Sequence, residues 1–292
     1  MRDTNPVQPA GSLLVAATPI GNLEDITFRA LRALREADVI AAEDTRQTLR
    51  LLNHFDIKKP LVSCHDMNEH DKAGGLVRRI LEGQRMVLVS DAGTPGISDP
   101  GEILIRTAIA AGVPVSMAPG PAAAVMAVVL SGLPTGRFCF EGFLPSARKD
   151  RIRQLEALKT ETRTMVFYES PHRLRASLSD LFAVLGDRRC ALARELTKLH
   201  EEVQRGTLSE LVACYGEREP RGEYAVVVEG EAASTLALAE REDWSRMPVH
   251  AHVAMYESAG MDRMTAMKKA AKDRGLSKRD IYQALQEQAQ GQ

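Results

Sequence analysis

The chain has 292 residues, and its 38 Lys and Arg nearly balance its 39 Asp and Glu, for a formal net charge of −1. This length suggests about two domains, and the charge balance restricts any nucleic-acid binding to a local patch. The four cysteines are widely spaced without a Cys-x-x-Cys pair, and no apolar run is long enough to span a bilayer, so we expect a cytoplasmic protein with reduced thiols, no metal site and no membrane contact.

The first half of the chain alternates short apolar runs with amphipathic helical patterns. Residues 1–11 are polar and contain two prolines, which predicts a disordered tail. Strands are predicted at 12–17, 39–42, 61–64, 86–89 and 113–117, and helices between them and at 122–130. Thr27 is the expected cap of the first helix, with Phe28, Leu31 and Leu34 on one face. Strict alternation of buried strands with helices favours a parallel sheet over residues 12–131.

The stretch from Met86 to Gly101 is the centre of this half. The strand at 86–89 leads into a loop rich in Gly and Pro, after which we expect a helix with Asp99 as its N-cap, Pro100 first and Glu102 third. Loops at the carboxyl ends of parallel strands bind ligands in open α/β sheets, and glycine lets a ligand approach the main chain closely. A plain strand-to-helix connection is the alternative, although such connections usually need only about two to six residues.

The second half, residues 132–230, contains more strands and fewer helices. Strands are predicted at 138–140, 164–168, 190–193, 202–205 and 224–229. Ser170 and Pro171 mark the start of a helix, as cap and first residue. This composition predicts a mixed sheet. Residues 231–246 are rich in Ala and charge without a clear period and predict a linker, whereas residues 247–292 return to a helical period and predict a small helical domain.

The chain lacks several standard functional motifs. It has no G-x-G-x-x-G, no G-x-x-x-x-G-K-[ST], no H-E-x-x-H and no G-x-S-x-G, and its seven histidines show no metal-ligand spacing. What remains is a set of small turns at the ends of several strands, which bind a ligand largely through main-chain groups. This pattern favours a nucleoside-containing cofactor over a bare metal ion.

Six motifs in order resemble the tetrapyrrole (corrin/porphyrin) methylase superfamily, and specifically its branch of 16S ribosomal RNA (cytidine) 2′-O-ribose methyltransferases, which act at the decoding centre. The motifs are Ala17–Asp25, Ala42–Arg46, Ser90–Gly101, Pro119–Ala122, Phe140–Pro145 and Glu169–Arg173. The resemblance implies two α/β domains with S-adenosylmethionine in the cleft between them. It also implies a small C-terminal helical domain, a homodimer, and small-subunit ribosomal RNA, in the assembled subunit, as the partner.

The same resemblance implies which residues hold the cofactor. They are Pro19, Asp91, Ala92, Gly93, Thr94, Pro95, Ile97, Ala122, Ala123, Tyr168, Glu169, Leu196 and Thr197. Asp91 is the best local partner for charged or hydroxyl groups of the cofactor, although it is also suited to cap its own loop. Thr94 stands where tetrapyrrole methylases often have aspartate, which argues against a tetrapyrrole substrate.

Methyl transfer to a ribose hydroxyl gains from a base, because an unperturbed hydroxyl is a poor nucleophile. Polar residues just after strand ends are the candidates for a base or an orienting group. They are Glu43, Asp44, Glu169, Glu195 and Lys198. A lysine would need desolvation to be neutral near pH 7, and each of these side chains has a surface charge or a loop cap as its alternative role.

The C-terminal region carries a local excess of positive charge. Residues 261–279 contain seven basic and two acidic residues, and the pattern of helix, Gly275 and helix resembles a helix-turn-helix, with Ser277 and Asp280 as the cap of its second helix. The predicted RNA-binding residues are Arg148, Lys149, Lys268, Lys269, Lys272, Lys278 and Arg279. A solvated basic face is the alternative for the tail. For the whole protein, a tetrapyrrole methyltransferase and a non-enzymatic ribosome- or RNA-binding protein are the rival interpretations.

Overall fold

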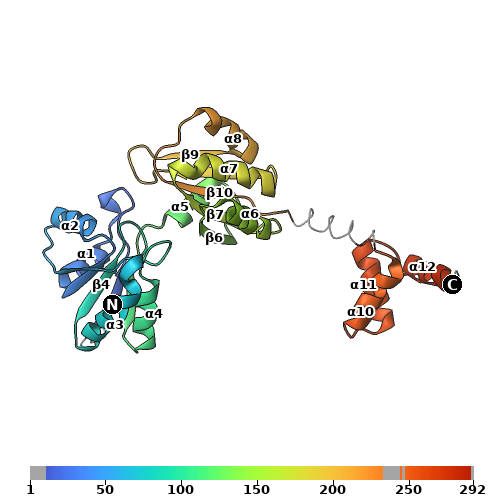
Figure 1. The fold of residues 1–292 in the computed structure, drawn as a ribbon, viewed down its shortest axis with the longest axis horizontal. Coiled ribbons are helices and arrows are strands. Elements are labelled where there is room, and N and C mark those ends of the chain that lie inside the picture. The colour runs from blue at the N-terminus through green and yellow to red at the C-terminus, as the bar shows by residue number, and fades with distance from the viewer. Residues whose placement is uncertain (1–10, 233–243, 245–246, 291–292) are drawn as a thin grey trace, which may run out of the picture. The chain divides into compact units, whose positions relative to one another are not determined.

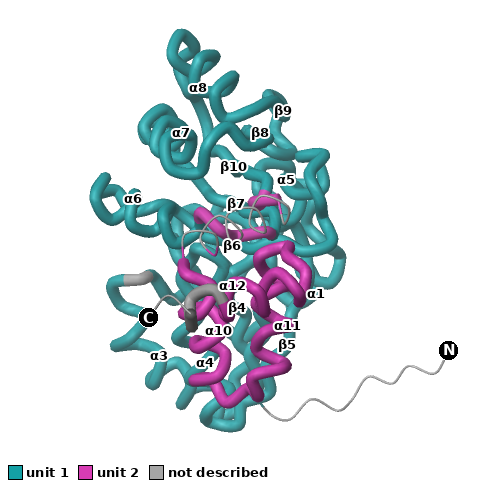
Figure 2. The backbone as a smooth tube through the Cα atoms, turned by 90° about the vertical axis from the view of Figure 1, so that its right-hand side faces the viewer, with its two compact units in different colours: residues 1–158, 163–229 teal, residues 159–162, 230–292 magenta. Residues whose placement is uncertain are grey.

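The computed structural model describes residues 11–232, 244 and 247–290. The predicted tail and most of the predicted linker, residues 1–10, 233–243 and 245–246, lie outside this part. The chain divides into two compact units, shown in two colours in Figure 2. One comprises residues 1–158 and 163–229, and the other comprises residues 159–162 and 230–292. Each unit is described by itself.

The first sheet has five strands, all parallel, in the order β3-β2-β4-β1-β5. Figure 1 shows this part of the chain in blue to green. Its strands are β1 (Ser12–Ala16), β2 (Val39–Ala42), β3 (Leu61–Ser63), β4 (Arg85–Val89) and β5 (Val115–Ala118). The connecting helices are η1 (Leu23–Asp25), α1 (Phe28–Glu36), α2 (Thr45–His54), α3 (Asp66–Leu81) and α4 (Glu102–Ala110). Because β2 and most of β4 are buried, these strands read as continuous apolar runs. The predicted parallel sheet is confirmed.

Helix α1 differs from its prediction at one residue. The Oγ1 atom of Thr27 accepts a hydrogen bond from the Ala30 N–H at 3.1 Å, so the predicted cap is confirmed. Leu31 and Leu34 are buried, but the Phe28 side chain is 89% exposed. The reason is helical geometry: a spacing of three residues rotates each side chain about 60° further around the helix, so Phe28 lies well off the face of Leu34.

Helix α4 starts two residues later than predicted, with Gly101 rather than Asp99 as its N-cap. Gly101 has a φ of +129°, and a Cβ atom there would lie 2.9 Å from Leu88 Cδ2, so only glycine is accommodated without strain. At the other end of α4, the Val113 N–H donates to the Ala108 carbonyl at 3.0 Å. Val113 therefore closes the helix, and β5 begins at Val115 rather than Val113.

The second sheet is mixed, as predicted, with the order β6-β7-β10-β8-β9 (Figure 1). Only β6 and β7 run parallel, and the other three pairs are antiparallel. Its strands are β6 (Phe138–Phe143), β7 (Thr164–Glu169), β8 (Arg189–Arg194), β9 (Glu202–Thr207) and β10 (Tyr224–Val228). The helices of this half are α5 (Ala123–Ser131), α6 (Arg148–Ala157), α7 (Pro171–Leu185) and α8 (Leu208–Glu217).

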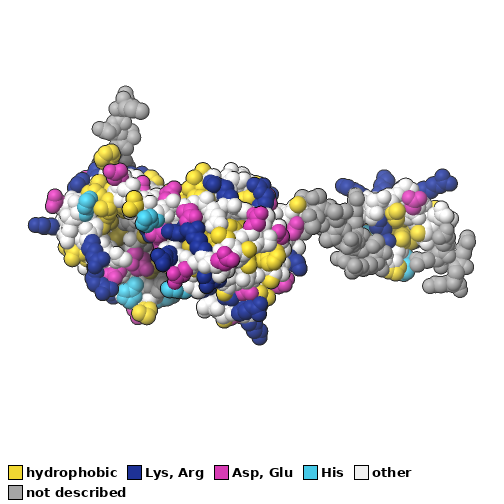
Figure 3. All heavy atoms as spheres, turned by 90° about the horizontal axis from the view of Figure 1, so that it is seen from above, with side chains coloured by type: hydrophobic (Ala, Val, Ile, Leu, Met, Phe, Trp, Pro, Cys, Tyr) yellow, Lys and Arg dark blue, Asp and Glu magenta, His cyan; other side chains and the backbone are white. Residues whose placement is uncertain are grey.

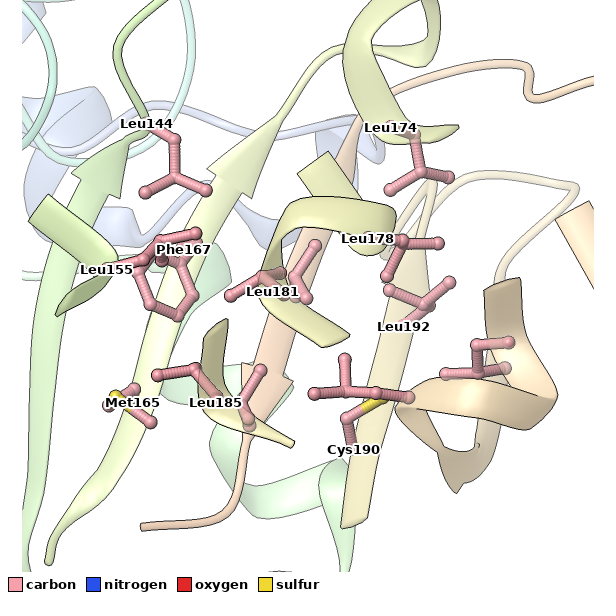
Figure 4. Close-up of a cluster of buried hydrophobic side chains, with 14 of the residues drawn as sticks. Leu144, Leu155, Met165, Phe167, Leu174, Leu178, Leu181, Leu185, Cys190 and Leu192 are labelled. Carbon is pink, nitrogen blue, oxygen red and sulfur yellow. The ribbon is translucent and has the colours of Figure 1, made fainter. Parts of the chain in front are cut away.

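One face of the second sheet packs against α7, and Figure 4 shows the side chains between them. The labelled residues are Leu144, Leu155, Met165, Phe167, Leu174, Leu178, Leu181, Leu185, Cys190 and Leu192. The four leucines of α7 recur at three- and four-residue spacing and are all buried. Pro171 starts this helix as predicted. This packing fixes β7, whose last residues reach the candidate site.

The opposite face of the same sheet is covered by α5. Side chains alternate along β7, so Val166 and Tyr168 point away from the α7 side. The small residues Ala124 and Ala127 of α5 pack in one cluster with Val166 and Ala191. Small side chains allow the helix to lie close to the strands, and this brings the N-terminus of α5 near the end of β7.

From residue 247 to residue 290, the C-terminal unit forms the helices α10 (Val249–Ser258), α11 (Arg263–Arg274) and α12 (Lys278–Gln290). Their core includes Val253, Met267 and Ile281. Met264, predicted in the apolar period, is 56% exposed because it lies in the first turn of α11 at the edge of this core. Ser277 and Asp280 cap α12 reciprocally, as predicted. Among the described residues, none of the helices combines the length and apolar character needed to cross a membrane.

Candidate active site

Two loops at the carboxyl end of the first sheet are joined through their main chains. Thr18, after β1, and Gly93, after β4, exchange two hydrogen bonds, with N···O distances of 2.8 and 3.0 Å. The Thr18 hydroxyl also donates to the Ser90 carbonyl at 3.2 Å. Because β1 and β4 are neighbours in the sheet, their ends meet at this edge. Gly93 has a φ of +77°, a conformation that favours glycine.

The loop after β5 joins the same assembly. The Thr94 hydroxyl donates to the Pro121 carbonyl at 3.3 Å. A Cβ atom at Gly120 would lie 2.9 Å from Ala17 Cβ, so the two backbones approach each other closely here. Three loops that were predicted separately therefore form one surface.

A cavity of about 490 Å³ lies against these loops, within the larger unit, and residues from both sheets line it. This volume lies within the usual range of about 300–1,000 Å³ for small-molecule sites. The predicted residues that line it are Ala92, Gly93, Thr94, Ile97, Ala122, Ala123, Tyr168, Glu169, Glu195, Leu196 and Lys198. The structure thus brings together residues that are far apart in the sequence.

Four predicted cofactor residues are not among those lining the cavity: Pro19, Asp91, Pro95 and Thr197. The Asp91 carboxylate accepts from the Asp44 N–H at 3.0 Å, and the Asp91 N–H donates to Glu43 at 3.1 Å. Asp91 therefore ties the β4 loop to the β2 loop. Thr197 has a φ of +67°, and its buried Oγ1 has no hydrogen-bond partner within the described part of the chain.

The sequence reasoning missed the aromatic wall of the cavity. Phe138, Phe140 and Phe143, all on β6, line it. Phe140 and Phe143 are an odd number of positions apart, so a regular strand would place them on opposite faces. A register shift between Phe140 and Gly142 leaves Glu141 as an extra residue, and both rings then flank Tyr168, with centroid distances of 4.9 and 5.6 Å. The motif Phe140–Pro145 was visible in the sequence, but this geometry was not.

Tyr168 connects this wall to helix α5. Its hydroxyl oxygen accepts a hydrogen bond from the Ala124 N–H at 3.0 Å, in the first turn of the helix. Burial raises the pKa of the Tyr168 hydroxyl above its usual value, so the group stays neutral at physiological pH. The ring of Tyr168 is therefore held by Phe140 and Phe143, and its hydroxyl is held by the hydrogen bond from Ala124.

The charged part of the cavity is a cluster around Lys198. The Lys198 Nζ lies 2.9 Å from Glu195 Oε1 and 3.8 Å from Glu223 Oε2. A Cβ atom at Gly21 would overlap with the Lys198 stem, and one at Gly222 would lie 2.6 Å from the Glu195 side chain. The lack of a side chain at Gly21 and Gly222 therefore leaves the space that the Lys198–Glu195 pair occupies. Glu195 itself has a φ of +50°, an uncommon conformation of the kind that concentrates at functional sites.

The surroundings of Glu195 keep it ionised. Burial alone would raise its pKa, but hydrogen bonds from Lys198 Nζ and the Glu223 N–H, with the nearby positive charges, together hold the pKa below its usual value. A carboxylate with a lowered pKa is a weak proton acceptor. Glu195 is therefore better suited to hold Lys198 than to abstract a proton.

The sequence profile of the Tetrapyrrole (Corrin/Porphyrin) Methylases matches residues 12–212, which include the whole first sheet and four strands of the second. The chain belongs to this family. A relative of this methylase from Halalkalibacterium halodurans, named Ribosomal RNA small subunit methyltransferase I, is 49% identical over 272 residues, 93% of each chain. A relative of the same name from Thermotoga maritima is 48% identical over 221 residues, which cover 76% of this chain and 99% of its own. The Thermotoga protein therefore lacks a counterpart to about a quarter of this chain.

Solved structures agree on the fold of the methylase. The methyltransferase CobJ matches with a TM-score of 0.57 at 22% identity, over 76% of this chain and 95% of its own. The uroporphyrin-III C-methyltransferase of Thermus thermophilus complexed with S-adenyl homocysteine matches with a TM-score of 0.53 at 20% identity, over 75% and 97%. At these identities the likeness is one of fold.

As a methyltransferase of this family, the protein uses S-adenosylmethionine as its methyl donor. The cavity fits such a molecule. Phe140 and Tyr168 offer apolar rings for a planar base, and the carboxylates of Asp99 and Glu223 outweigh the single ammonium of Lys198, which suits a ligand with a positive sulfonium. In the described ranges, His, Cys, Asp and Glu form no cluster of three that could hold a metal ion.

The other three candidates for a base or an orienting group have structural partners, and that of Glu43 is the Asp91 N–H described above. Glu169 is buried, and its carboxylate accepts hydrogen bonds from the Ser170 N–H and the Ser177 hydroxyl. Asp44 caps α2 and is not among the residues lining the cavity. Hydrogen bonds from the side chain and main chain of Arg46 lower the pKa of Asp44 to about 2. The structure therefore brings only Glu169, Glu195 and Lys198 of the predicted catalytic set to the cavity.

Proposed function

We propose that this methylase transfers a methyl group from S-adenosylmethionine to the ribose 2′-hydroxyl of a cytidine in small-subunit (16S) ribosomal RNA, at the decoding centre. The observation that carries the proposal is the 49% identity, over 93% of both chains, to a relative named for methylation of this RNA. The Lys198–Glu195 pair adds to it, because the cavity offers a hydroxyl acceptor a fixed positive group.

The protein contributes to this reaction mainly by positioning the substrate and by placing a positive charge beside the reacting oxygen. When bound, S-adenosylmethionine supplies a methyl group on a positively charged sulfur. Lys198 donates a hydrogen bond to the ribose oxygen, which orients that oxygen and offsets the negative charge that develops as its proton leaves to solvent. Glu195 acts as a positioning residue, since it holds the ammonium of Lys198 at 2.9 Å.

Two basic residues that follow β6 in the chain support an RNA substrate. Arg148 and Lys149 open helix α6, a short distance along the chain from Phe143. The Arg148 side chain is 74% exposed, and its Nε lies 3.1 Å from Asp180 Oδ1, so this positive charge is held in place at the surface. A phosphate backbone binds such groups with little regard to sequence.

The experiment is methyl transfer from tritiated S-adenosylmethionine to small subunits and to naked 16S RNA, followed by digestion to nucleosides. We expect label in 2′-O-methylcytidine at one position. Lys198→Ala should lower kcat by about 10²–10³-fold, the usual loss for one such donor, while Glu195→Gln should lower it less. Label on a base, or on a tetrapyrrole in place of RNA, would contradict the proposal.

The proposal extends to the assembly and location of the protein. We place it in the cytoplasm, where ribosomal subunits are made, and expect the assembled subunit to be a better substrate than naked RNA. We also expect a homodimer, because two-fold dimers are the commonest soluble oligomers. Light scattering at micromolar concentration should give twice the mass of 32.0 kDa, and a lone monomer would contradict this part.

A further inference from the structure

The C-terminal unit presents a basic surface that the methylation site does not use. Figure 3 shows Lys and Arg side chains gathered along one edge of this unit, beside a patch of apolar ones. The buried side of α11 is made by small and apolar residues, Ala266, Met267, Ala270 and Ala271. Its lysines all lie on the exposed side. The helix therefore separates its apolar face from a positively charged one.

The basic residues of this unit fall into two classes. Arg274 belongs to the core, because its guanidinium donates to His252 Nδ1 and to the Met247 carbonyl. Lys269 lies over the Tyr256 ring, with its Nζ 4.6 Å from the centroid. Lys268 and Lys272, in contrast, form no hydrogen bond or ion pair within the part of the chain that the structure describes. Their charges are available to a partner.

These free lysines continue onto α12. Met264, Lys268 and Lys272 follow one another at four-residue spacing on α11, which places them in one stripe. The Lys278 Nζ lies 2.8 Å from Met264 Sδ, so the first turn of α12 joins this stripe. One turn further on, Tyr282 is 55% exposed. We call Met264, Lys268, Lys272, Lys278 and Tyr282 the basic face.

Contacts at the end of α11 and the start of α12 hold the basic face in place. Gly275 ends α11 in the left-handed conformation, with a φ of +66°. The Ser277 N–H donates to Asp280 at 2.8 Å, and the Asp280 N–H donates back to Ser277 at 3.2 Å, which fixes the start of α12. Ile281 anchors this helix with a fully buried side chain. Tyr282 follows directly, so its ring is held outward by the helix rather than free to fold onto the core.

We propose that the basic face docks ribosomal RNA, with phosphates on Lys268, Lys272 and Lys278 and one unpaired base stacked on Tyr282. Charge complementarity selects a polyanion, and an exposed aromatic ring among lysines is the combination that binds unpaired RNA bases. The inference rests on the proposed function for the identity of the RNA. Docking is separate from chemistry, because the cavity lies wholly in the other unit and a relative that lacks about a quarter of this chain carries the same name.

The test uses the full-length protein and a triple variant, Lys268→Ala with Lys272→Ala and Lys278→Ala. Its matched control replaces the same three lysines by arginine, which keeps the charge. Each phosphate contact contributes just under one unit to the slope of log affinity against log salt. The alanine variant should therefore flatten this slope for naked 16S RNA by up to about three units, and the arginine control should leave it unchanged.

A second pair of variants tests the stacked base. Tyr282→Ala should weaken RNA binding by roughly 5-fold or more, whereas Tyr282→Phe, which keeps the ring, should bind normally. Both alanine variants should raise the KM for RNA while kcat and the affinity for S-adenosylmethionine stay the same. The fluorescence of Trp244, the only tryptophan in the chain, reports whether the C-terminal unit still melts normally in each variant.

The outcomes separate this inference from the proposed function. If the unaltered protein methylates no ribosomal RNA, the proposed function fails, whatever the tail does. If it does methylate RNA but the alanine variant keeps its salt slope and KM, the basic face is overturned as an RNA site. Weaker binding to assembled subunits with unchanged binding to naked RNA would also overturn it, because the partner would then be a ribosomal protein.

Discussion

Asp180 is a buried charged residue whose loss should strongly destabilise the larger unit. It lies on α7 and is 3% exposed, and it faces Arg151 of α6, which is 5% exposed. Arg151 Nε and Nη2 donate to Asp180 Oδ2 at 2.8 and 2.6 Å. The Nη1 atom of Arg151 donates to the carbonyls of Pro145 and Ser146 at 3.1 Å. The pair thus fastens the loop after β6 to the two helices.

Asp180→Ala should destabilise the unit by about 3–5 kcal/mol, the usual cost of stranding one member of a buried ion pair. We expect the upper part of this range, because the two carbonyls that hold Arg151 Nη1 prevent the guanidinium from moving into solvent. For a domain of this size the midpoint of thermal unfolding should fall by roughly 2–4 °C per kcal/mol.

The assay is urea unfolding followed by circular dichroism, with Trp244 fluorescence as an internal reference for the C-terminal unit, which should not change. Glu102→Ala is a matched control, because it removes an exposed ion pair with Arg106 on α4 and should cost less than about 1 kcal/mol. The double variant Asp180→Ala with Arg151→Met removes the stranded charge and should be more stable than Asp180→Ala alone. If the double variant instead shows the sum of two large losses, or if Asp180→Ala costs no more than the control, the reasoning is wrong.

Two further predictions concern the cavity and the tail. Gly93→Val should abolish the binding of S-adenosylmethionine, because a β-branched residue is strained at a φ of +77° and its Cβ would lie 3.3 Å from Ile20 Cγ2; unchanged affinity by calorimetry would contradict the assignment of this loop. His252 is fully buried, and burial, with the nearby Arg274, lowers its pKa below the ordinary 6.5, against a smaller opposite effect of Asp273. The contribution of His252 to the stability of the C-terminal unit is therefore complete above about pH 6.5 and is lost as the pH falls through the folded-state pKa of His252. Melting followed by Trp244 should drop between about pH 7 and pH 5, and a His252→Phe variant with the same pH dependence would refute this.

Much of the fold was predictable because the central strands of both sheets, such as β2, β4 and β10, are buried on both faces. Runs such as Met86–Val89 carry no polar residue, so they can only be core strands or buried helix segments, and their length and the glycines that follow decide between the two. The start of α4 was not predictable in the same way. The preference of Asp for the N-cap reflects local hydrogen bonding, whereas Gly101 holds that position because of its contact with Leu88, a tertiary constraint.

The candidate site likewise contains residues that the sequence predicted and residues that it could not predict. Loop residues such as Ala92 and Ala122 were found because they belong to contiguous motifs, and they line the cavity. Phe143 was missed because one extra residue, Glu141, reverses the face on which Phe143 lies, and simple alternation cannot show that. The close approach of the Lys198 side chain to Gly21 could not be predicted from the sequence either, because it depends on how the two sheets of the larger unit pack.

The bridge between Thr18 and Gly93 has a consequence for how this family changes over evolution. Both of its hydrogen bonds use peptide groups alone, so the joined loops keep their shape whichever side chains they carry. Side chains next to the bridge, such as that of Ala92, can then be exchanged one at a time without breaking these two hydrogen bonds. A scaffold fixed by its backbone can therefore keep its shape in relatives whose loop side chains differ.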